Sequence, residues 1–298
     1  MRRVLQGCLL VLLVPLAAQG QPVPARDLLE FPLGAILEPP ALALEAGSGL
    51  WNPATILLDP SSRMRVGVAS LAAGSAQGVD GQLLAAAWRR ASGTTIAVSL
   101  ARAAIGGLVR TESDPQSIGT IPYATTMASV TLARSLLPHL SAGVAARWRV
   151  GRADQESRQA VAADVGLVLH DLPIRDARVA VSSFLWRPGR EIEDRPAVLA
   201  AADFRVAGSG IERQTRIGYT LHGVNRGVRE QGGFLSGRLD RLELRAAYLA
   251  TDAGARTVGR LRTGLTLFYA RFAVGIGREE GVSGLGPVYQ FTLRSLIQ

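Results

Sequence analysis

Residues 140–150 read LSAGVAARWRV, and this stretch shows the pattern that decides the fold. Every second residue belongs to an apolar series, which consists of Leu140, Ala142, Val144, Ala146, Trp148 and Val150. The residues between them are small, polar or charged, namely Ser141, Gly143, Ala145, Arg147 and Arg149. Successive side chains of a β-strand point to opposite faces, so the stretch predicts a strand with one apolar and one polar face.

The same alternation recurs along the chain in about fourteen segments, and the boundaries allow a count of 12 to 16. The predicted strands span 63–72, 80–89, 93–104, 121–133, 139–150, 156–169, 174–187, 195–206, 212–222, 229–238, 242–251, 257–268, 271–278 and 284–295. Each span is about ten residues or slightly longer, which is the length that a tilted strand needs to cross a bilayer.

The connections between these segments alternate in character. One set is tight, such as 90–92 and 239–241, whereas the other set is mostly longer or more charged, such as 105–120 and 151–155. Outer-membrane barrels have short periplasmic turns and longer extracellular loops. The sequence therefore predicts an all-β fold, a transmembrane antiparallel β-barrel of about 14 strands. An even number of strands places both chain termini on the short-turn, periplasmic side. A soluble exported β-sandwich or propeller is the alternative.

The chain begins with a predicted secretory signal at residues 1–20. Arg2 and Arg3 precede a short apolar core, and small residues follow at Ala18-Gln19-Gly20. The predicted organisation is this signal, an N-terminal plug or hatch segment at 21–58, and an outer-membrane barrel at 59–298. The single cysteine, Cys8, lies within the signal, so the mature chain is expected to have no disulfide or cysteine metal site.

The charge of the chain comes from arginine. The formal net charge is +9, and all 33 basic residues are arginines. For an exported chain this balance argues against nucleic acid as a partner and is compatible with a polar lumen or with anionic lipid head groups. The polar strand faces predict lumen-facing residues, which are Arg147, Arg149, Asp164, Arg216, Arg260 and Arg262. A soluble core would pay a desolvation cost for each of these charges, whereas a wet lumen tolerates them.

No catalytic, cofactor or metal site emerges from the sequence. The three histidines, His139, His170 and His222, are not spaced as a metal pair. Asp164 and His170 share a strand face, but about 20 Å separates residues six apart on a strand, which is too far for one hydrogen bond. Gly-x-Ser-x-Gly does not occur. We therefore predict that the protein is not an enzyme and carries no cofactor.

Three stretches resemble a known family. Asn52, Pro53 and Ala54 stand just ahead of the first predicted strand. "LLPHLSAGVAARW" (136–148) is followed by "AVAADVGLVLHDLP" (160–173), in which Asp164 and Gly166 form an Ala-x-Asp-x-Gly pattern. Together with the leader and the series of strands, these features resemble the PorV/PorQ group of outer-membrane proteins. That group is itself similar to the long-chain fatty-acid transporter (FadL-type) barrels of fourteen strands.

The resemblance implies location and partners as well as fold. It implies a monomer in the outer membrane of a Gram-negative bacterium, in contact with outer-membrane lipid, with the segment before the first strand folded inward as a plug. The PorV/PorQ resemblance implies support for type IX protein secretion or surface attachment, with secreted cargo proteins as partners. The alternative is FadL-like passage of small hydrophobic compounds across the outer membrane.

Overall fold

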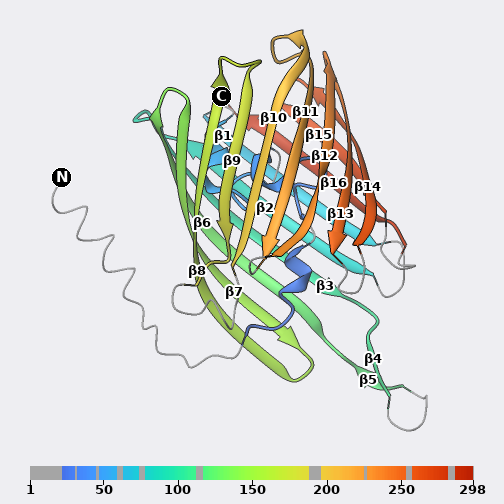
Figure 1. The fold of residues 1–298 in the computed structure, drawn as a ribbon. Helices are drawn as coiled ribbons and strands as arrows, with labels where there is room; N and C mark the ends of the chain where they lie inside the picture. Colours follow the sequence, from blue (N-terminus) through green and yellow to red (C-terminus); the bar gives the residue numbers. More distant parts are fainter. Residues whose placement is uncertain are drawn as a thin grey trace, which may run out of the picture.

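Fourteen antiparallel strands form one closed barrel, in which the first strand pairs with the last. The computed structural model describes residues 22–30, 32–44, 47–58, 63–73, 78–111, 117–187, 196–224, 227–252, 257–280 and 286–297. The signal predicted for residues 1–20, with Cys8, lies outside this described part. The predicted antiparallel barrel of about 14 strands is confirmed, and the soluble sandwich or propeller is wrong (Figure 1).

The barrel strands match the predicted segments to within a few residues. They are β1 Met64–Ala73, β2 Val79–Arg89, β3 Thr94–Ile105, β6 Tyr123–Leu137, β7 Leu140–Ala153, β8 Glu156–Leu172, β9 Ala177–Phe184, β10 Ala197–Ser209, β11 Arg213–Val224, β12 Gly227–Leu239, β13 Leu242–Asp252, β14 Thr257–Tyr269, β15 Phe272–Glu279 and β16 Val288–Ile297. Two further strands, β4 Val109–Thr111 and β5 Ser117–Thr120, pair with each other inside the connection predicted as a loop.

One boundary difference is at β9, which is predicted to reach residue 187. It ends at Phe184 because Leu185 adopts a left-handed conformation, with φ at 57°. This turn carries Leu185 into a buried position. The next residue, Trp186, forms an isolated bridge to Ala163 of β8.

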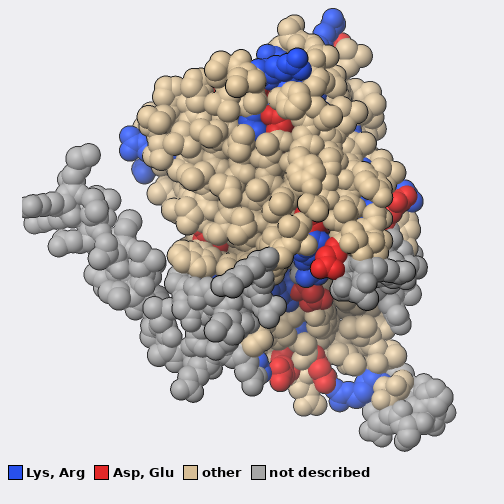
Figure 2. Space-filling model, in the orientation of Figure 1, with Lys and Arg blue, Asp and Glu red and all other residues tan. Residues whose placement is uncertain are grey.

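The outer face of the barrel is apolar and the inner face is polar or small. On β8, Val161, Val165 and Leu167 are exposed, whereas Asp164 and Gly166 between them are buried. The same alternation runs along the other strands, and uncharged side chains cover most of the wall visible in Figure 2. Exposed apolar side chains in a continuous band are stable against lipid, so the wall has the surface of a transmembrane barrel.

The two ends of the barrel differ in their connections. At the turn end the strands are joined by residues 90–93, 138–139, 173–176, 210–212, 240–241 and 270–271. At the other end, which we call the loop end, the β3–β6 connection carries the β4–β5 hairpin and projects beyond the wall (Figure 1). The connection between β7 and β8, predicted at 151–155 in the longer or more charged set, is a turn of two residues at 154–155. β1 begins and β16 ends at the turn end, where Met64 pairs with Ile297.

The described residues of 22–58 form the N-terminal segment, which contains three short 3-10 helices. These are η1 Asp27–Glu30, η2 Pro40–Leu42 and η3 Pro53–Leu57. The segment is largely buried and packs against inward-facing wall residues, with η3 against β6, β7 and β8 and η2 against β9 and β10. It therefore lies in the lumen. In the described part of the chain, no helix is both long and apolar enough to cross a membrane.

Candidate functional site

A pair of wall glycines receives the N-terminal segment. Gly143 of β7 and Gly166 of β8 face each other in the strand register and both point inward. A Cβ atom on Gly143 would lie 2.5 Å from the carbonyl carbon of Pro53, and one on Gly166 would overlap the Oδ1 atom of Asn52. Since any side chain at either position would occupy the space of the segment, the two glycines form a notch that fits Asn52-Pro53.

Asn52 holds the segment in this notch through both ends of its amide. Its Oδ1 atom accepts a hydrogen bond of 3.0 Å from the backbone nitrogen of Ala54, as an N-cap of η3, and its Nδ2 atom donates one of 2.9 Å to the carbonyl oxygen of Ala41. Pro53 follows at the first helical position, where its missing N–H costs nothing. The Asn-Pro-Ala motif thus couples the start of η3 to the chain around η2.

Replacing Asn52 with alanine should loosen the segment. The backbone nitrogen of Ala54 and the carbonyl of Ala41 would both lose their partners in a fully buried place. Each unsatisfied buried group costs about 1–3 kcal/mol, so we expect a lower urea midpoint and faster proteolysis of residues 22–58 in the folded barrel. Ser48→Ala is the control, because it removes a polar side chain from the same segment at the loss of one long contact, 3.4 Å to the Thr55 hydroxyl. Equal behaviour of the two variants would contradict this role of Asn52.

An aromatic stack fixes the residue before the motif. The indole of Trp51 packs on the ring of Phe184 with 4.8 Å between the ring centroids. The guanidinium of Arg147, on β7, lies 5.2 Å from the centroid of the Phe184 ring. The Trp51 indole nitrogen donates to the carbonyl of Leu33 at 2.9 Å, and the Ser182 hydroxyl donates to the carbonyl of Trp51 at 2.9 Å. Phe184 and Ser182 are ordinary members of a predicted strand, so no pattern in the sequence pointed to them.

The six charged residues predicted for the lumen all lie on inward faces, in three places. Arg147 forms a buried ion pair with Asp164 across β7 and β8. Next to it, Arg149 donates to the carbonyl oxygens of Val23 and Pro24 at 3.2 and 3.3 Å, so it holds the start of the segment near the loop end. Arg216 lies toward the turn end, and Arg260 and Arg262 lie on the opposite side of the wall, on β14.

Arg260 and Arg262 belong to a buried network with two carboxylates that the sequence analysis did not name. Arg262 donates to Glu279 of β15 at 2.7 Å and to Glu230 of β12 at 3.0 Å, and Arg260 pairs with the same two carboxylates. We call these four residues the β12–β15 ion network. Two positive and two negative charges balance, which makes their burial possible.

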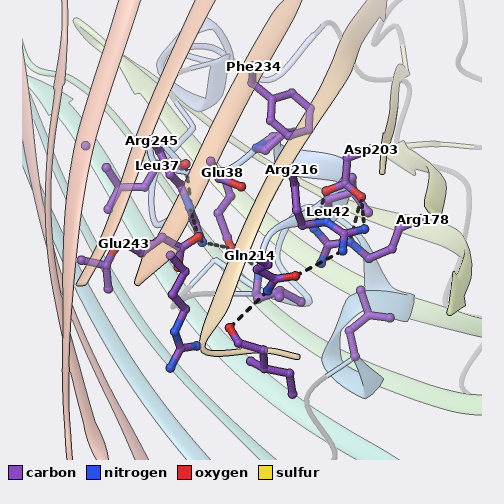
Figure 3. Close-up of a pocket in the computed structure, with 18 of the residues that line it drawn as sticks. Leu37, Glu38, Leu42, Arg178, Asp203, Gln214, Arg216, Phe234, Glu243 and Arg245 are labelled. Carbon is purple, nitrogen blue, oxygen red and sulfur yellow. Dashed lines mark hydrogen bonds and ion pairs between the residues drawn. The ribbon is translucent and has the colours of Figure 1, made fainter. Parts of the chain in front are cut away.

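A cavity of about 780 Å³ remains between the N-terminal segment and strands β10–β16. Apolar side chains of the segment line one side, including Ile36, Leu37 and Leu42, and the aromatic residues Phe234 and Phe268 of the wall also line it. Figure 3 shows Leu37, Leu42 and Phe234 around the cavity. Turn residues Gly210, Ile211 and Ala270 also line it, which places the cavity at the turn end. Its size is typical of a binding site for one small organic molecule.

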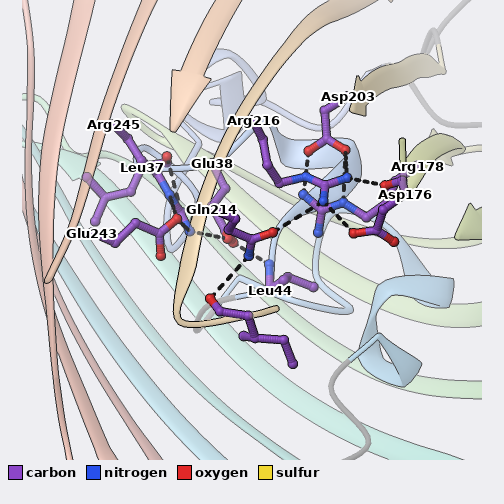
Figure 4. A network of polar contacts seen from close by, with 11 residues as sticks. Leu37, Glu38, Leu44, Asp176, Arg178, Asp203, Gln214, Arg216, Glu243 and Arg245 are labelled. Atoms are coloured by element: carbon purple, nitrogen blue, oxygen red, sulfur yellow. Dashed lines mark hydrogen bonds and ion pairs between the residues drawn. The ribbon is translucent and has the colours of Figure 1, made fainter. Parts of the chain in front are cut away.

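Arginines surround this cavity. Eight arginines and five carboxylates line it, a formal excess of three positive charges. In Figure 4, Arg178 and Arg216 converge on Asp203, and Arg216 binds it at 2.8 Å and Asp176 at 2.9 Å. On the facing side Arg245 binds Glu38 of the segment at 2.8 Å and Glu243 at 2.7 Å. The site therefore combines an apolar floor with a positively charged wall, and it joins wall to segment through Arg245 and Glu38.

The described residues contain no cluster of three or more histidine, cysteine, aspartate or glutamate side chains able to hold a metal ion. Asp164 and His170 are not brought together, because the Asp164 carboxylate binds Arg147 and the backbone nitrogen of Trp186, whereas His170 pairs with Asp171. The Asp164 carboxylate and the His170 ring are thus engaged with other partners.

A closed barrel with an apolar outer band and a charged interior defines the class of outer-membrane β-barrels. Among solved structures, the chain is similar to the toluene transporter TbuX of Ralstonia pickettii, with a TM-score of 0.59, 10% identity, and coverage of 86% of this chain and 94% of that chain. Weaker similarity links it to the outer membrane protein Omp33 of Acinetobacter baumannii, with a TM-score of 0.49, 11% identity and coverage of 79% and 98%. No family model and no curated protein sequence matches the chain.

Proposed function

We propose that this protein is a monomeric outer-membrane barrel that passes small apolar or amphipathic compounds, with the N-terminal segment as the barrier inside its lumen. The observation that carries the proposal is the cavity of about 780 Å³, because apolar residues of the segment form part of its wall. A compound bound there touches the segment directly. Its binding energy is therefore available to shift the segment's position.

The arrangement of the lumen favours gated passage over an open pore. A barrel of this strand number is too wide for its own side chains to fill. Here the start of the N-terminal segment, around Val23 and Pro24, and the β12–β15 ion network occupy the lumen toward the loop end, and the rest of the segment lies beside the cavity. Passage would thus require the segment to move, and the contacts that it would have to break are the Glu38–Arg245 pair and the bonds of Asn52.

Support for type IX secretion, the first reading of the PorV/PorQ resemblance, has less in its favour. The similarity in barrel fold to the toluene transporter favours the transport alternative. A docking function would also call for extensive loops, whereas the β7–β8 connection at the loop end is two residues long. We therefore favour transport.

Binding and uptake of two probes test the proposal. We would titrate the purified protein with laurate and with toluene, and then follow the uptake of both by Gram-negative cells that express it. Saturable binding and faster uptake are expected for at least one probe. If neither probe binds and expression leaves both uptake rates unchanged, passage of small apolar or amphipathic compounds is excluded as the function.

A substitution that fills the cavity should abolish both effects. Ala247 of β13 lines the cavity, and Ala247→Trp would place an indole inside it. We expect binding to weaken by about 100-fold or more, because a ligand of drug size that loses its pocket loses most of the area it buries. Ala202→Trp is the matched control, since Ala202 is exposed on the outer face of β10 and its indole would meet lipid. Unchanged binding in Ala247→Trp would show that the compound does not bind in this cavity.

A further inference from the structure

Two arginines stand on the outer face of the wall near the loop end. Arg102 of β3 lies between buried Ala101 and Ala103, and Arg152 of β7 follows buried Gly151. Both arginines are exposed, so both side chains point away from the lumen. On the same faces, Leu100 and Trp148 are exposed apolar residues closer to the middle of the wall. The arginines therefore mark the level at which the apolar band ends.

Neither guanidinium has a hydrogen bond or an ion pair with the part of the chain that the structure describes. This contrasts with the lumen arginines, such as Arg147 and Arg262, whose charges are met by carboxylates. The nearest outward carboxylate by strand register, Asp80 of β2, stands opposite Ala104, on the far side of Arg102 from Arg152. The two positive charges thus face the surroundings of the barrel on its outer side.

The register gives the spacing of the pair. Arg102 lies beside Thr126 of β6, and Arg152 lies beside Ala124, two residues nearer the loop end. Two strand spacings across and two residues along place their Cα atoms roughly 12 Å apart. The outward residues of β6 between them, Ala124 and Thr126, are short, so a head group could approach both guanidiniums at once.

The chemistry of this position selects phosphate. A guanidinium forms paired hydrogen bonds to phosphate oxygens, and at the edge of a bilayer the anionic groups within reach are lipid phosphates. The loop end is the end away from the chain's entry into β1 and exit from β16, and in outer-membrane barrels it faces the cell surface. The leaflet on that side is built of glycolipid whose disaccharide carries two phosphates.

We propose that Arg102 and Arg152 together bind the two phosphates of one lipid A-type glycolipid in the outer leaflet. The glycolipid's acyl chains would lie along the apolar face of β3, β6 and β7 below the arginines. The site is separate from the cavity, so it does not depend on which compound, if any, passes through the lumen. Binding of the glycolipid would fix the position of β3, β6 and β7 along the membrane normal.

Binding of lipid A to the purified full chain in detergent tests the proposal. We would compare lipid A, dephosphorylated lipid A and phosphatidylglycerol on the wild type and on the double variant Arg102→Gln with Arg152→Gln. Lipid A should bind the wild type most tightly. The double variant should bind it about 30-fold more weakly, the combined size expected for two basic residues at an anionic lipid surface.

Arg134→Gln is the matched control. Arg134 is also exposed on the outer face, on β6 between the two strands of the site, but it lies near the turn end. It should keep wild-type affinity for lipid A. The proposal is overturned if dephosphorylated lipid A or phosphatidylglycerol binds as well as lipid A, or if the double variant binds lipid A like the wild type. Folding of each variant is checked by its faster migration on an unboiled gel.

Discussion

Replacing Gly166 with valine should open the lumen. The valine side chain would take the space of Asn52 Oδ1 and of the Pro53 ring, so the segment could not remain in the notch between β7 and β8. Overpacking the valine side chain against Asn52 and Pro53 would cost about 1–3 kcal/mol. The segment can relieve this cost by dissociating from the wall. Because an unfilled barrel of this size contains water, we expect liposome swelling with small sugars to rise by about tenfold or more.

Gly237→Val is the control for this experiment. Gly237 lies near the turn end of β12, on the same outward face as Leu235, and a Cβ atom there would meet nothing within 4 Å. The control variant should remain as impermeable as the wild type, which separates the loss of the notch from the general effect of valine in a strand. If Gly166→Val is folded and equally impermeable, the notch does not hold the barrier. Gly143→Val should behave like Gly166→Val, since the same turn of chain rests on both.

Replacing Arg262 with alanine should strongly destabilise the barrel. Its loss would leave Glu230 and Glu279 buried beside one remaining positive charge, Arg260. Removing one partner of a buried ion pair costs about 3–5 kcal/mol, because the other charge stays desolvated and uncompensated. The measurement is the urea midpoint in detergent. Unfolding is monitored on unboiled gels as the shift from the fast-migrating folded band to the slow-migrating unfolded band. Arg213→Ala, which breaks an exposed pair with Asp240, should leave the midpoint unchanged.

A double variant decides whether charge balance is the cause. Arg262→Leu combined with Glu279→Leu removes one positive and one negative group and leaves the Arg260–Glu230 pair intact. It should recover a large part of the stability lost in Arg262→Ala. If the double variant is as unstable as the two single losses added together, the network contributes through packing and not through compensation of charge.

The barrel itself was predictable from sequence because lipid and lumen impose opposite demands on the two faces of each strand. Alternation from Leu140 to Val150 therefore located β7 to within three residues, and it placed Arg147 and Arg149 on the inner face. The β4–β5 hairpin escaped this reasoning, since strands of three and four residues are too short to show a period. β9 ended early through a local turn at Leu185, which no pattern of hydrophobicity encodes.

For the contact between the N-terminal segment and the wall, the sequence pointed to the residues of the segment but not to the wall residues of the notch. Asn52-Pro53-Ala54 stood out through a resemblance, but its partners Gly143, Gly166 and Phe184 lie far along the chain. Their meeting depends on the register between β7 and β8 and on the point where β9 turns inward. The carboxylates of the β12–β15 ion network were missed for a related reason. Glu230 stands at the end of a predicted strand and Glu279 just beyond one, in a predicted loop, where the assignment of a face is weakest.

The position of the cavity at the turn end makes the protein kinetically asymmetric. A compound arriving from that side reaches the cavity by diffusion, whereas one arriving from the loop end first meets the segment and the β12–β15 ion network. Entry from the two sides should therefore differ in activation enthalpy. A passive barrel nevertheless obeys detailed balance, so this asymmetry changes the speed of equilibration and never its endpoint. Accumulation on one side would have to come from a reaction that consumes the compound after it has crossed.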